Sequence, residues 1–308
     1  MIKLTKESAP IIKALEEEGF LITPEKLIVS DGDFEEDPIR IMRAVRFSAE
    51  LGLDLHKETY EAVAKKRRLL AGVSPDMIRQ EFERIIVADH AGSGLKMLAR
   101  TGLMSYIIGG LAERMTKRAA SDFADLVENI DKTEQITDRR LGLFYTCFEK
   151  KDAYEAAKIL NYDKKTLLKI KDALELLEPM HFIATKLEFK KFVAQYGMAR
   201  YEYLNGLSKA ISVVHDTPNA KILTRYYIME EIKAKGEPLF LKDLVIDKDD
   251  LTSRGIAEGR RADEILEILF EMVQRRPQCN QRDHLLSCAR EYSKNKIVAA
   301  VQRMRWLK

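Results

Sequence analysis

The chain has 308 residues, with 52 Lys and Arg against 49 Asp and Glu, and a hydrophobic fraction of 46%. This length and composition exclude wholesale disorder and allow a large core or several compact units. No stretch approaches the roughly 20 consecutive apolar residues of a membrane-spanning helix, and the acidic residues near the start are unlike a signal peptide. The three Cys show no CxxC spacing, so we expect reduced thiols, no metal site, and a soluble cytoplasmic protein without a membrane partner.

The net charge of +3 conceals an uneven distribution along the chain. Residues 1–37 carry four Lys against ten Asp and Glu, residues 38–80 carry nine Lys and Arg against five acids, and residues 275–308 carry nine against two. Two basic regions favour a polyanionic partner held at two places, because each neutralised phosphate releases counterions. An ordinary solvated helical surface gives the same pattern, and charge alone does not separate the two interpretations.

Apolar residues recur at helical spacing through most of the chain, and Gly or Pro separates the periodic segments. The pattern predicts an all-α protein of serial short helices, although a helical repeat array remains an alternative. Only residues 20–29 resemble a strand, and Pro24 interrupts them. Helices are predicted over 39–53, 57–70, 75–87, 92–102, 117–130, 138–148, 151–160, 163–177, 186–195, 198–213, 218–234, 260–275, 280–291 and 294–305, with Ser74 as the N-cap before Pro75.

The segment that begins at Glu36 carries the most specific signal. Asp37 precedes Pro38, so we expect Asp37 to cap a helix on which Arg40 lies one turn later, near the same face. A carboxylate accepts from the exocyclic amine of cytosine or adenine and a guanidinium donates to the neighbouring ring nitrogen, so such a pair would select C and A over U. The alternative is a structural cap beside an exposed Arg.

Three stretches, EDPIRIMRAVRFSAELG, VSPDMIRQEFERII and GLKMLARTGLM, occur in the order found in a known family. The chain resembles the bacterial class II tRNA nucleotidyltransferases, the CCA-adding enzymes, and the related bacterial poly(A) polymerases, strongly over 28–108 and plausibly over 238–290. The resemblance implies that Glu36, Asp37 and Arg40 form a protein template for the incoming base. It also implies that a helix with Arg79 and Glu81 supports this template, and we add Arg43 from the same arginine stripe.

The resemblance also predicts four parts: a remnant or linker over 1–34, a base-reading and RNA-binding neck over 35–125, a helical body over 126–236, and a basic tRNA-binding tail over 237–308. The expected RNA contacts are Lys65, Lys66, Arg67, Arg68, Arg275, Arg276, Arg303 and Arg305. Cations late in a helix also complement its dipole, so the run from Lys65 to Arg68 has a purely structural alternative.

The family's catalytic head, with an Asp-x-Asp pair for two metals, should lie before the neck. Asp31 and Asp33 have that spacing, but the sequence predicts neither a β-sheet to hold them nor a phosphate-binding turn beside them, so we expect no catalytic residue in this chain. Mg²⁺ with ATP or CTP is implied for the complete enzyme, whose head would be a separate subunit or part of a longer chain. A non-catalytic RNA-binding paralogue and an α-helical interaction scaffold remain alternatives, and the choice between CCA, CC, A and poly(A) addition stays open.

Two other candidates come from single residues. His215 and Asp216 have the order of a metal-phosphohydrolase dyad, but a helix-end pair is the better interpretation because the other ligands are missing. The tyrosines at 201, 203, 226 and 227 lie near basic residues and could stack on bases, whereas core packing is expected for most of them.

Overall fold

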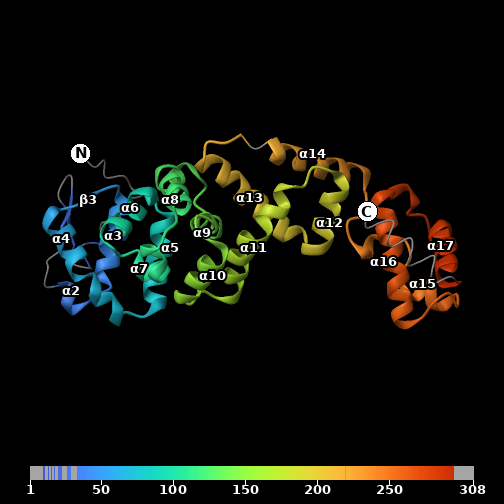
Figure 1. Cartoon of the computed structure of the whole chain (residues 1–308), viewed down its shortest axis with the longest axis horizontal. Helices are drawn as coiled ribbons and strands as arrows, with labels where there is room; N and C mark the ends of the chain where they lie inside the picture. The colour runs from blue at the N-terminus through green and yellow to red at the C-terminus, as the bar shows by residue number, and fades with distance from the viewer. Residues whose placement is uncertain are drawn as a thin grey trace. The chain divides into compact units, whose positions relative to one another are not determined.

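The computed structural model describes residues 10, 13, 15, 17, 20–22, 26–28, 33–218 and 220–294. The predicted all-α fold is confirmed, since the described chain is a series of short helices with one small sheet (Figure 1). Two compact units share the chain: unit 1 comprises Met1–Leu177 with Tyr203–Pro218, and unit 2 comprises Glu178–Glu202 with Asn219–Lys308. No helix within the described residues is long and apolar enough to cross a membrane.

Unit 1 contains the sheet and most of the helices. Helices α11 (Lys164–His181) and α13 (Met198–Val214) contribute residues to both units. The other elements of unit 1 are β1 (Leu21–Ile22), β2 (Lys26–Ile28), α2 (Asp33–Glu36), α3 (Arg40–Leu51), β3 (Asp54–Leu55), α4 (Lys57–Lys66), η1 (Arg67–Gly72), α5 (Pro75–Val87), α6 (Ala91–Arg100), α7 (Ser105–Ile108), η2 (Gly109–Glu113), α8 (Lys117–Asn129), η3 (Ile130–Lys132), α9 (Thr137–Thr146) and α10 (Lys150–Ile159).

The stretch 20–29, which resembles an interrupted strand in the sequence, contains two short strands. These strands, β1 and β2, pair antiparallel, with Leu21 opposite Ile28 and Ile22 opposite Leu27. β2 also pairs in parallel with β3, with Lys26 opposite Asp54 and Leu27 opposite Leu55. Because β2 precedes α3 and β3 follows it, α3 is part of the crossover that joins two parallel strands.

Helix α5 begins as its sequence predicts. The Ser74 hydroxyl accepts a hydrogen bond from the Met77 N–H at 3.4 Å, and Pro75 occupies the first helical position. The helix predicted over 57–70 is divided in the structure. The α-helix α4 ends at Lys66, and the 3₁₀ helix η1 continues from Arg67 to Gly72.

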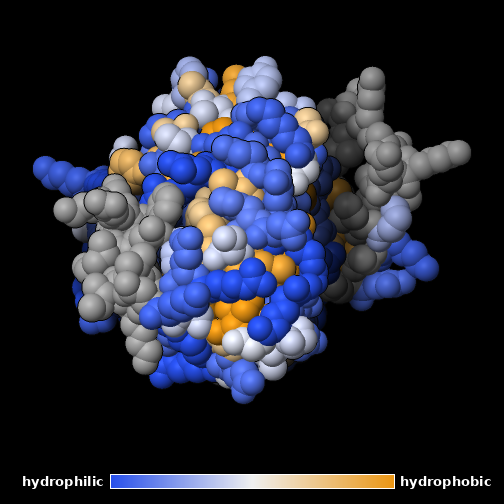
Figure 2. Space-filling view, turned by 90° about the vertical axis from the view of Figure 1, so that its right-hand side faces the viewer, coloured by the Kyte–Doolittle hydropathy of each residue, from blue (hydrophilic) through white to orange (hydrophobic). Residues whose placement is uncertain are grey.

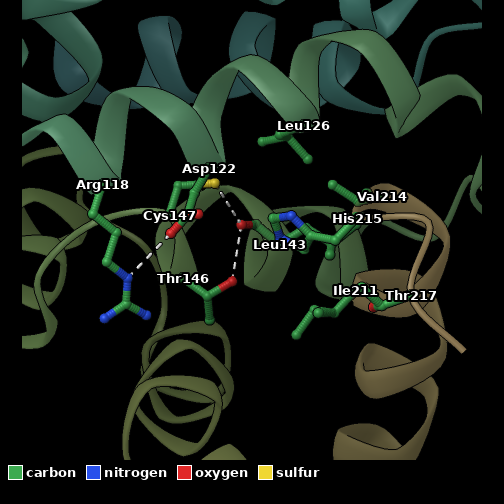
Figure 3. Close-up of a pocket in the computed structure, with 10 residues that line it drawn as sticks. All are labelled: Arg118, Asp122, Leu126, Leu143, Thr146, Cys147, Ile211, Val214, His215 and Thr217. Atoms are coloured by element: carbon green, nitrogen blue, oxygen red, sulfur yellow. Dashed lines mark hydrogen bonds and ion pairs between the residues drawn. The ribbon is translucent and has the colours of Figure 1, made fainter. Parts of the chain in front are cut away.

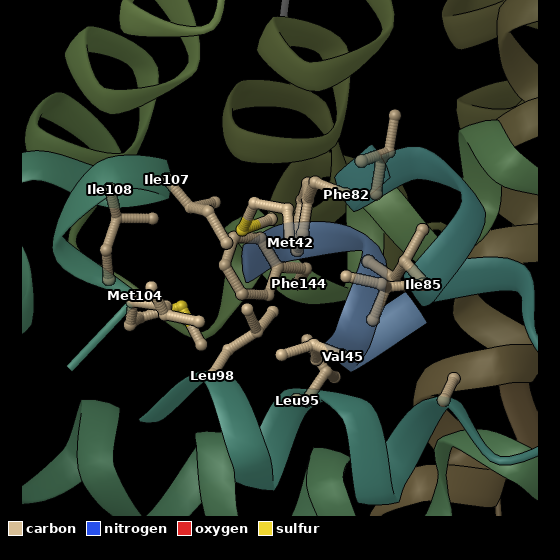
Figure 4. Packing of buried hydrophobic residues seen from close by; sticks show 14 of the residues in the cluster. Met42, Val45, Phe82, Ile85, Leu95, Leu98, Met104, Ile107, Ile108 and Phe144 are labelled. Carbon is tan, nitrogen blue, oxygen red and sulfur yellow. The ribbon is translucent and has the colours of Figure 1, made fainter. Parts of the chain in front are cut away.

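The core of unit 1 lies where α3, α5, α6 and α9 meet. Figure 4 shows Met42 of α3, Phe82 of α5, Leu98 of α6 and Phe144 of α9 converging, and the Phe82 and Phe144 rings pack edge to face at 5.0 Å. A close approach of α6 depends on Gly94, where an added Cβ would lie 2.7 Å from Cγ2 of Ile85. The apolar positions of these helices therefore form one contiguous core beneath α3.

A buried arginine of α9 links this core to the end of α5. Arg140 is fully buried and donates hydrogen bonds to the carbonyls of Ile86 at 3.0 Å, Ala88 at 3.1 Å and Thr133 at 2.8 Å. The last carbonyls of a helix lack intrahelical partners, so this guanidinium satisfies the C-terminal end of α5. Burial lowers the pKa of Arg140, and the fork of donors compensates for the lost hydration.

Unit 2 has its own apolar core, formed largely by α16 and α17. Its elements are α12 (Lys186–Tyr196), α14 (Ala220–Lys235), η4 (Leu241–Asp243), α15 (Lys248–Ser253), α16 (Gly259–Arg275), η5 (Pro277–Cys279) and α17 (Arg282–Lys294). The buried Lys190 of α12 pairs with Glu237 Oε2 at 2.5 Å and donates to the Gln274 carbonyl at 3.4 Å. The face in Figure 2, where α15–α17 lie, is mostly hydrophilic with a limited hydrophobic area.

Candidate nucleic-acid interface

The turn before α3 positions the predicted base-reading pair. The Arg40 N–H donates to the Asp37 carbonyl at 3.0 Å, and the Ile41 N–H donates to the Pro38 carbonyl at 3.1 Å. The helix begins at Arg40, and its N-cap residue, Ile39, makes no side-chain cap. The prediction that the Asp37 side chain caps α3 is therefore wrong, because a helical turn over 37–39 carries the chain into α3 through backbone bonds.

Both members of the predicted pair remain near the surface. The Asp37 side chain is 46% exposed, and the preceding Glu36 is also exposed. Arg40 is half-buried, and its guanidinium lies 5.4 Å from the centre of the Phe20 ring. Asp37 therefore presents an acceptor to solvent, three residues before a cation that lies against an aromatic ring.

The Asp37 carboxylate is also the first member of a chain of ion pairs that joins α3 to α5. Arg43 contacts Asp37 through Nη1 at 3.1 Å and Glu81 through Nε at 3.5 Å. Arg46, whose side chain is 1% exposed, contacts Glu81 at 2.6 Å and Glu50 at 3.0 Å. Alternating charges thus run from the exposed Asp37 to a guanidinium inside the helix pair, which fixes the rotation of α3 against α5.

The sequence analysis did not identify the last ion pairs of this series, which involve Glu50. Glu50 pairs a second time, with Arg84 of α5 at 3.0 Å. The i, i+4 spacing of Arg46 and Glu50 is the signal in the sequence that could have identified the first of these contacts. Nothing in the spacing of α3 indicates Arg84, because its distance from Glu50 depends on how the two helices pack.

The two residues assigned to the supporting helix have different surroundings. Glu81 contacts the arginines of α3, as the resemblance implies, but Arg79 contacts the region after α10 instead. Arg79 pairs with Asp76 at 3.0 Å and donates to the Asn161 carbonyl at 3.1 Å. Among the described residues, Arg79 makes no hydrogen bond or ion pair with the turn before α3, so its role in base reading stays a prediction.

The basic run from Lys65 to Arg68 divides into exposed and engaged side chains. Lys65 and Arg68 are exposed, whereas Lys66 pairs with Glu35 at 3.1 Å and Arg67 donates to the Ala64 carbonyl at 2.6 Å. In unit 2, Arg275 is half-buried and Arg276 is exposed at the end of α16. Arg303 and Arg305 lie outside the described residues, as do Asp31 and the Asp33 side chain.

The predicted helix-end position of His215 places it at a pocket of unit 1 with a volume of about 420 Å³ (Figure 3). His215 Nδ1 lies 3.0 Å from Asp125 Oδ2 of α8, so its partner is Asp125 rather than the adjacent Asp216. Burial raises the pKa of the Cys147 thiol at the same pocket, which keeps it protonated and unreactive. Within the described residues, no group of three or more His, Cys, Asp or Glu is arranged to hold a metal ion.

The candidate stacking tyrosines fall into two groups. Tyr201 is buried in unit 2 and Tyr203 is half-buried in unit 1, which agrees with core packing. Tyr226 and Tyr227 of α14 are exposed, with ring centres 5.6 Å apart. Only the second group could reach a nucleobase.

Of the two helices that the ion pairs join, α5 lies in a segment that matches a known family. Residues 52–115, from the end of α3 to η2, match the family described as "Probable RNA and SrmB- binding site of polymerase A". Together with the all-α fold, this match and the following relatives show that the chain is similar to class II tRNA nucleotidyltransferases.

The similar curated proteins are CCA-adding enzymes and a CC-adding tRNA nucleotidyltransferase. The chain is 36% identical over 122 residues to a CCA-adding enzyme of Geobacillus thermodenitrificans, which covers 35% of this chain and 30% of that enzyme. It is 38% identical over 108 residues to a CCA-adding enzyme of Bacillus velezensis, covering 33% and 27%. It is 40% identical over 76 residues to a CC-adding tRNA nucleotidyltransferase of Halalkalibacterium halodurans, covering 25% and 20%. The matched region thus spans less than a third of the length of these relatives.

Solved structures show the same fold over a longer stretch. The CCA-adding enzyme of Bacillus stearothermophilus in complex with CTP superposes with a TM-score of 0.61 at 21% identity, over 80% of this chain and 59% of that one. A second CCA-adding enzyme with CTP gives a TM-score of 0.53 at 15% identity, over 94% of this chain and 65% of that one. The similarity of fold therefore extends beyond the segment that sequence identity covers.

Proposed function

We propose that this chain supplies the base-reading and tRNA-binding part of a tRNA nucleotidyltransferase that rebuilds tRNA 3′ ends. The observation that supports it most is the exposed Asp37 carboxylate, which pairs with Arg43. Arg43 in turn contacts Glu81, which forms a buried pair with Arg46. A base-reading group must keep its orientation before the nucleotide arrives, and an ion pair to a rigid helix provides that orientation.

In this proposal, Asp37 accepts a hydrogen bond from the exocyclic amine of CTP or ATP, and Arg40 donates to the adjacent ring nitrogen. Uracil presents a carbonyl and an N–H in the reverse order, so its carbonyl would face the carboxylate without a hydrogen between them. Hydrogen bonds to charged groups contribute about 1.5–3 kcal/mol each, which suffices for a preference of tenfold or more. Glu36, exposed one residue before, lies where it would border the nucleotide, and Arg43 orients Asp37.

The tRNA would be held through its shape and its phosphates. Lys65 and Arg68 of unit 1 and Arg276 of unit 2 are exposed cations on the two regions whose charge favours a polyanion. Double-stranded RNA is recognised mainly by backbone contacts, because its deep major groove hides the base edges. We place the protein in the cytoplasm, in keeping with its proposed tRNA substrate.

Transfer of the nucleotide needs metal ions held by carboxylates. The described residues do not offer such a group, so they do not fit Mg²⁺, and no step through the metal is derived for them. We propose that a catalytic head, in the same or a separate polypeptide, completes the enzyme and binds Mg²⁺ with CTP or ATP. Poly(A) addition is a second candidate, favoured by the family description that covers residues 52–115.

Equilibrium binding of CTP, ATP and UTP to the chain tests the base-reading role. We expect CTP and ATP to bind about tenfold more tightly than UTP. Asp37→Ala should abolish this preference. Glu61→Ala is the matched control, since Glu61 is an exposed acid of α4 paired only with Lys57 at 3.9 Å in the described structure. Equal affinity for the three nucleotides in the unaltered chain would refute the proposal.

Binding of tRNA at increasing salt tests the second role. Several phosphate contacts predict an affinity that falls by orders of magnitude between about 50 and 200 mM salt, whereas an interaction scaffold predicts no such dependence. Incorporation of CTP and ATP into tRNA lacking its 3′ end then separates an enzyme part from a non-catalytic RNA-binding paralogue. Addition of a separately expressed head domain should restore incorporation only in the first case.

A further inference from the structure

A second pocket of unit 1, about 230 Å³ in volume, lies within and beside the segment that matches the RNA-binding family. Its apolar lining includes Met104, Met115, Phe123 and Phe148, and the Phe123 and Phe148 rings are tilted at 34° with centres 6.4 Å apart. Drug-sized ligands fill pockets of about 300–1,000 Å³, so this smaller volume suits a single flat ring system. Aromatic rings and thioethers are polarizable partners for such a ring.

The guanidinium of Arg67 borders the pocket. Arg67 is half-buried there, with Nη1 donating to the Ala64 carbonyl at 2.6 Å. Its Nε lies 3.1 Å from the point that a Cβ on Gly102 would occupy, and Gly102 has a φ of +77°. The glycine thus lets the guanidinium lie against the backbone, where four of its five N–H donors remain outside the bond to Ala64.

The charges around the pocket favour an anion. In the described part of the chain, no carboxylate makes an ion pair with Arg67, and the exposed Lys65 and Arg68 flank it in the sequence. Arg100, at the end of α6, follows the lining residue Ala99. The acid in the lining is Glu113, which is exposed. A ligand that is flat and apolar at one end and anionic at the other matches this arrangement.

We propose that this pocket binds one unpaired nucleobase of an RNA strand, with the adjoining phosphate at Arg67. Proteins that hold unpaired RNA combine a cationic track for the backbone with aromatic and apolar side chains for the bases, and both parts occur here within one pocket. The inference takes its RNA partner from the proposed function. It does not depend on base reading by Asp37 and Arg40.

The test measures the affinity of the full chain for a fluorescently labelled single-stranded RNA hexamer and for a duplex of the same sequence, by anisotropy. Ala99→Leu fills the pocket from an exposed position of α6, and Arg67→Gln removes the cation. The matched controls are Ser93→Leu, at an exposed position in the first turn of the same helix, and Arg260→Gln, an exposed arginine of unit 2. Circular dichroism and thermal unfolding check that every variant is folded.

We expect Ala99→Leu and Arg67→Gln each to weaken single-strand binding about tenfold, because stacking of one base and one charged contact are lost. The two controls and the duplex affinity should change less than twofold. Unchanged single-strand affinity in Ala99→Leu, or an equal loss for the duplex, would overturn the proposal. Binding of CTP and ATP should be unaffected by both pocket variants, so a failure of this inference is distinguishable from a failure of base reading.

Discussion

Glu81 offers the sharpest test of the ion-pair chain, because two arginines of α3 share its carboxylate. Glu81→Gln removes the charge and keeps the shape of the side chain. The Arg46 contact joins groups that are 1% and 11% exposed at 2.6 Å, and loss of one partner of a buried pair costs about 3–5 kcal/mol. Since Glu50 still pairs with Arg46, we expect the free energy of local unfolding of α3 and α5 to fall by about 2–3 kcal/mol.

A double-mutant cycle separates the two arginines. The Arg46–Glu81 coupling energy should be about 2 kcal/mol, because both side chains are shielded from water. The Arg43–Glu81 coupling should be only about 0.5–1 kcal/mol, because Arg43 is 26% exposed and its contact is 3.5 Å long. Arg43→Gln should nevertheless reduce the nucleotide preference more than Arg46→Gln does, since Arg43 pairs with Asp37 at 3.1 Å.

Native-state hydrogen exchange of peptides from α3 and α5 is the suitable assay. Two compact units make a single unfolding transition an unsafe measure, whereas amide exchange reports opening of each helix separately. Glu61→Gln on the surface of α4 serves as the control and should change exchange by less than about 0.5 kcal/mol. An Arg43–Glu81 coupling as large as that of Arg46 would refute the view that burial sets the strength of these pairs.

Three further perturbations test other parts of unit 1. Arg140→Met should lower the free energy of unfolding by about 3–5 kcal/mol, measured by hydrogen exchange of α5, because buried carbonyls lose their donor. Burial is the main cause that raises the pKa of Glu83, so ionisation of this acid opposes folding as pH rises. Glu83→Gln should therefore raise thermal stability at pH 7, and the gain should vanish below about pH 4, where folded and unfolded states are both protonated. Gly94→Ala should cost about 1–3 kcal/mol in chemical unfolding, since its Cβ would meet Ile85; an unchanged midpoint would contradict the close packing of α6.

Much of the fold follows from local patterns in the sequence. The spacing of apolar residues places α5 at the predicted bounds, and the Ser74–Pro75 cap marks its start, because both signals act within one turn. The sequence indicated one interrupted strand-like stretch over 20–29 and not two strands, because each strand has only two or three residues, and the pairing of β2 with β3 depends on the path of the chain through α3.

The sequence predicted which residues form the candidate site, but it did not predict most of their contacts. Asp37 and Arg40 lie at an exposed turn, but the sequence could not show that the Asp37 carboxylate reaches Arg43, six residues later. Likewise, Arg79 and Glu81 differ by two positions and so project about 200° apart around α5, with only Glu81 towards α3. The partners of the basic run were also beyond local reasoning, because Glu35 approaches Lys66 only in the folded chain.

The parallel pairing of β2 with β3 has a mechanical consequence for the turn that we propose reads the base. The strands hold together the two chain segments that flank α3, so an axial slide of this helix would have to stretch or shear their shared backbone hydrogen bonds. These hydrogen bonds constrain a tilt of α3 relative to the sheet less than they constrain its axial slide. If successive nucleotides require the template to readjust, that readjustment would be a rocking of the whole helix rather than a shift in its register.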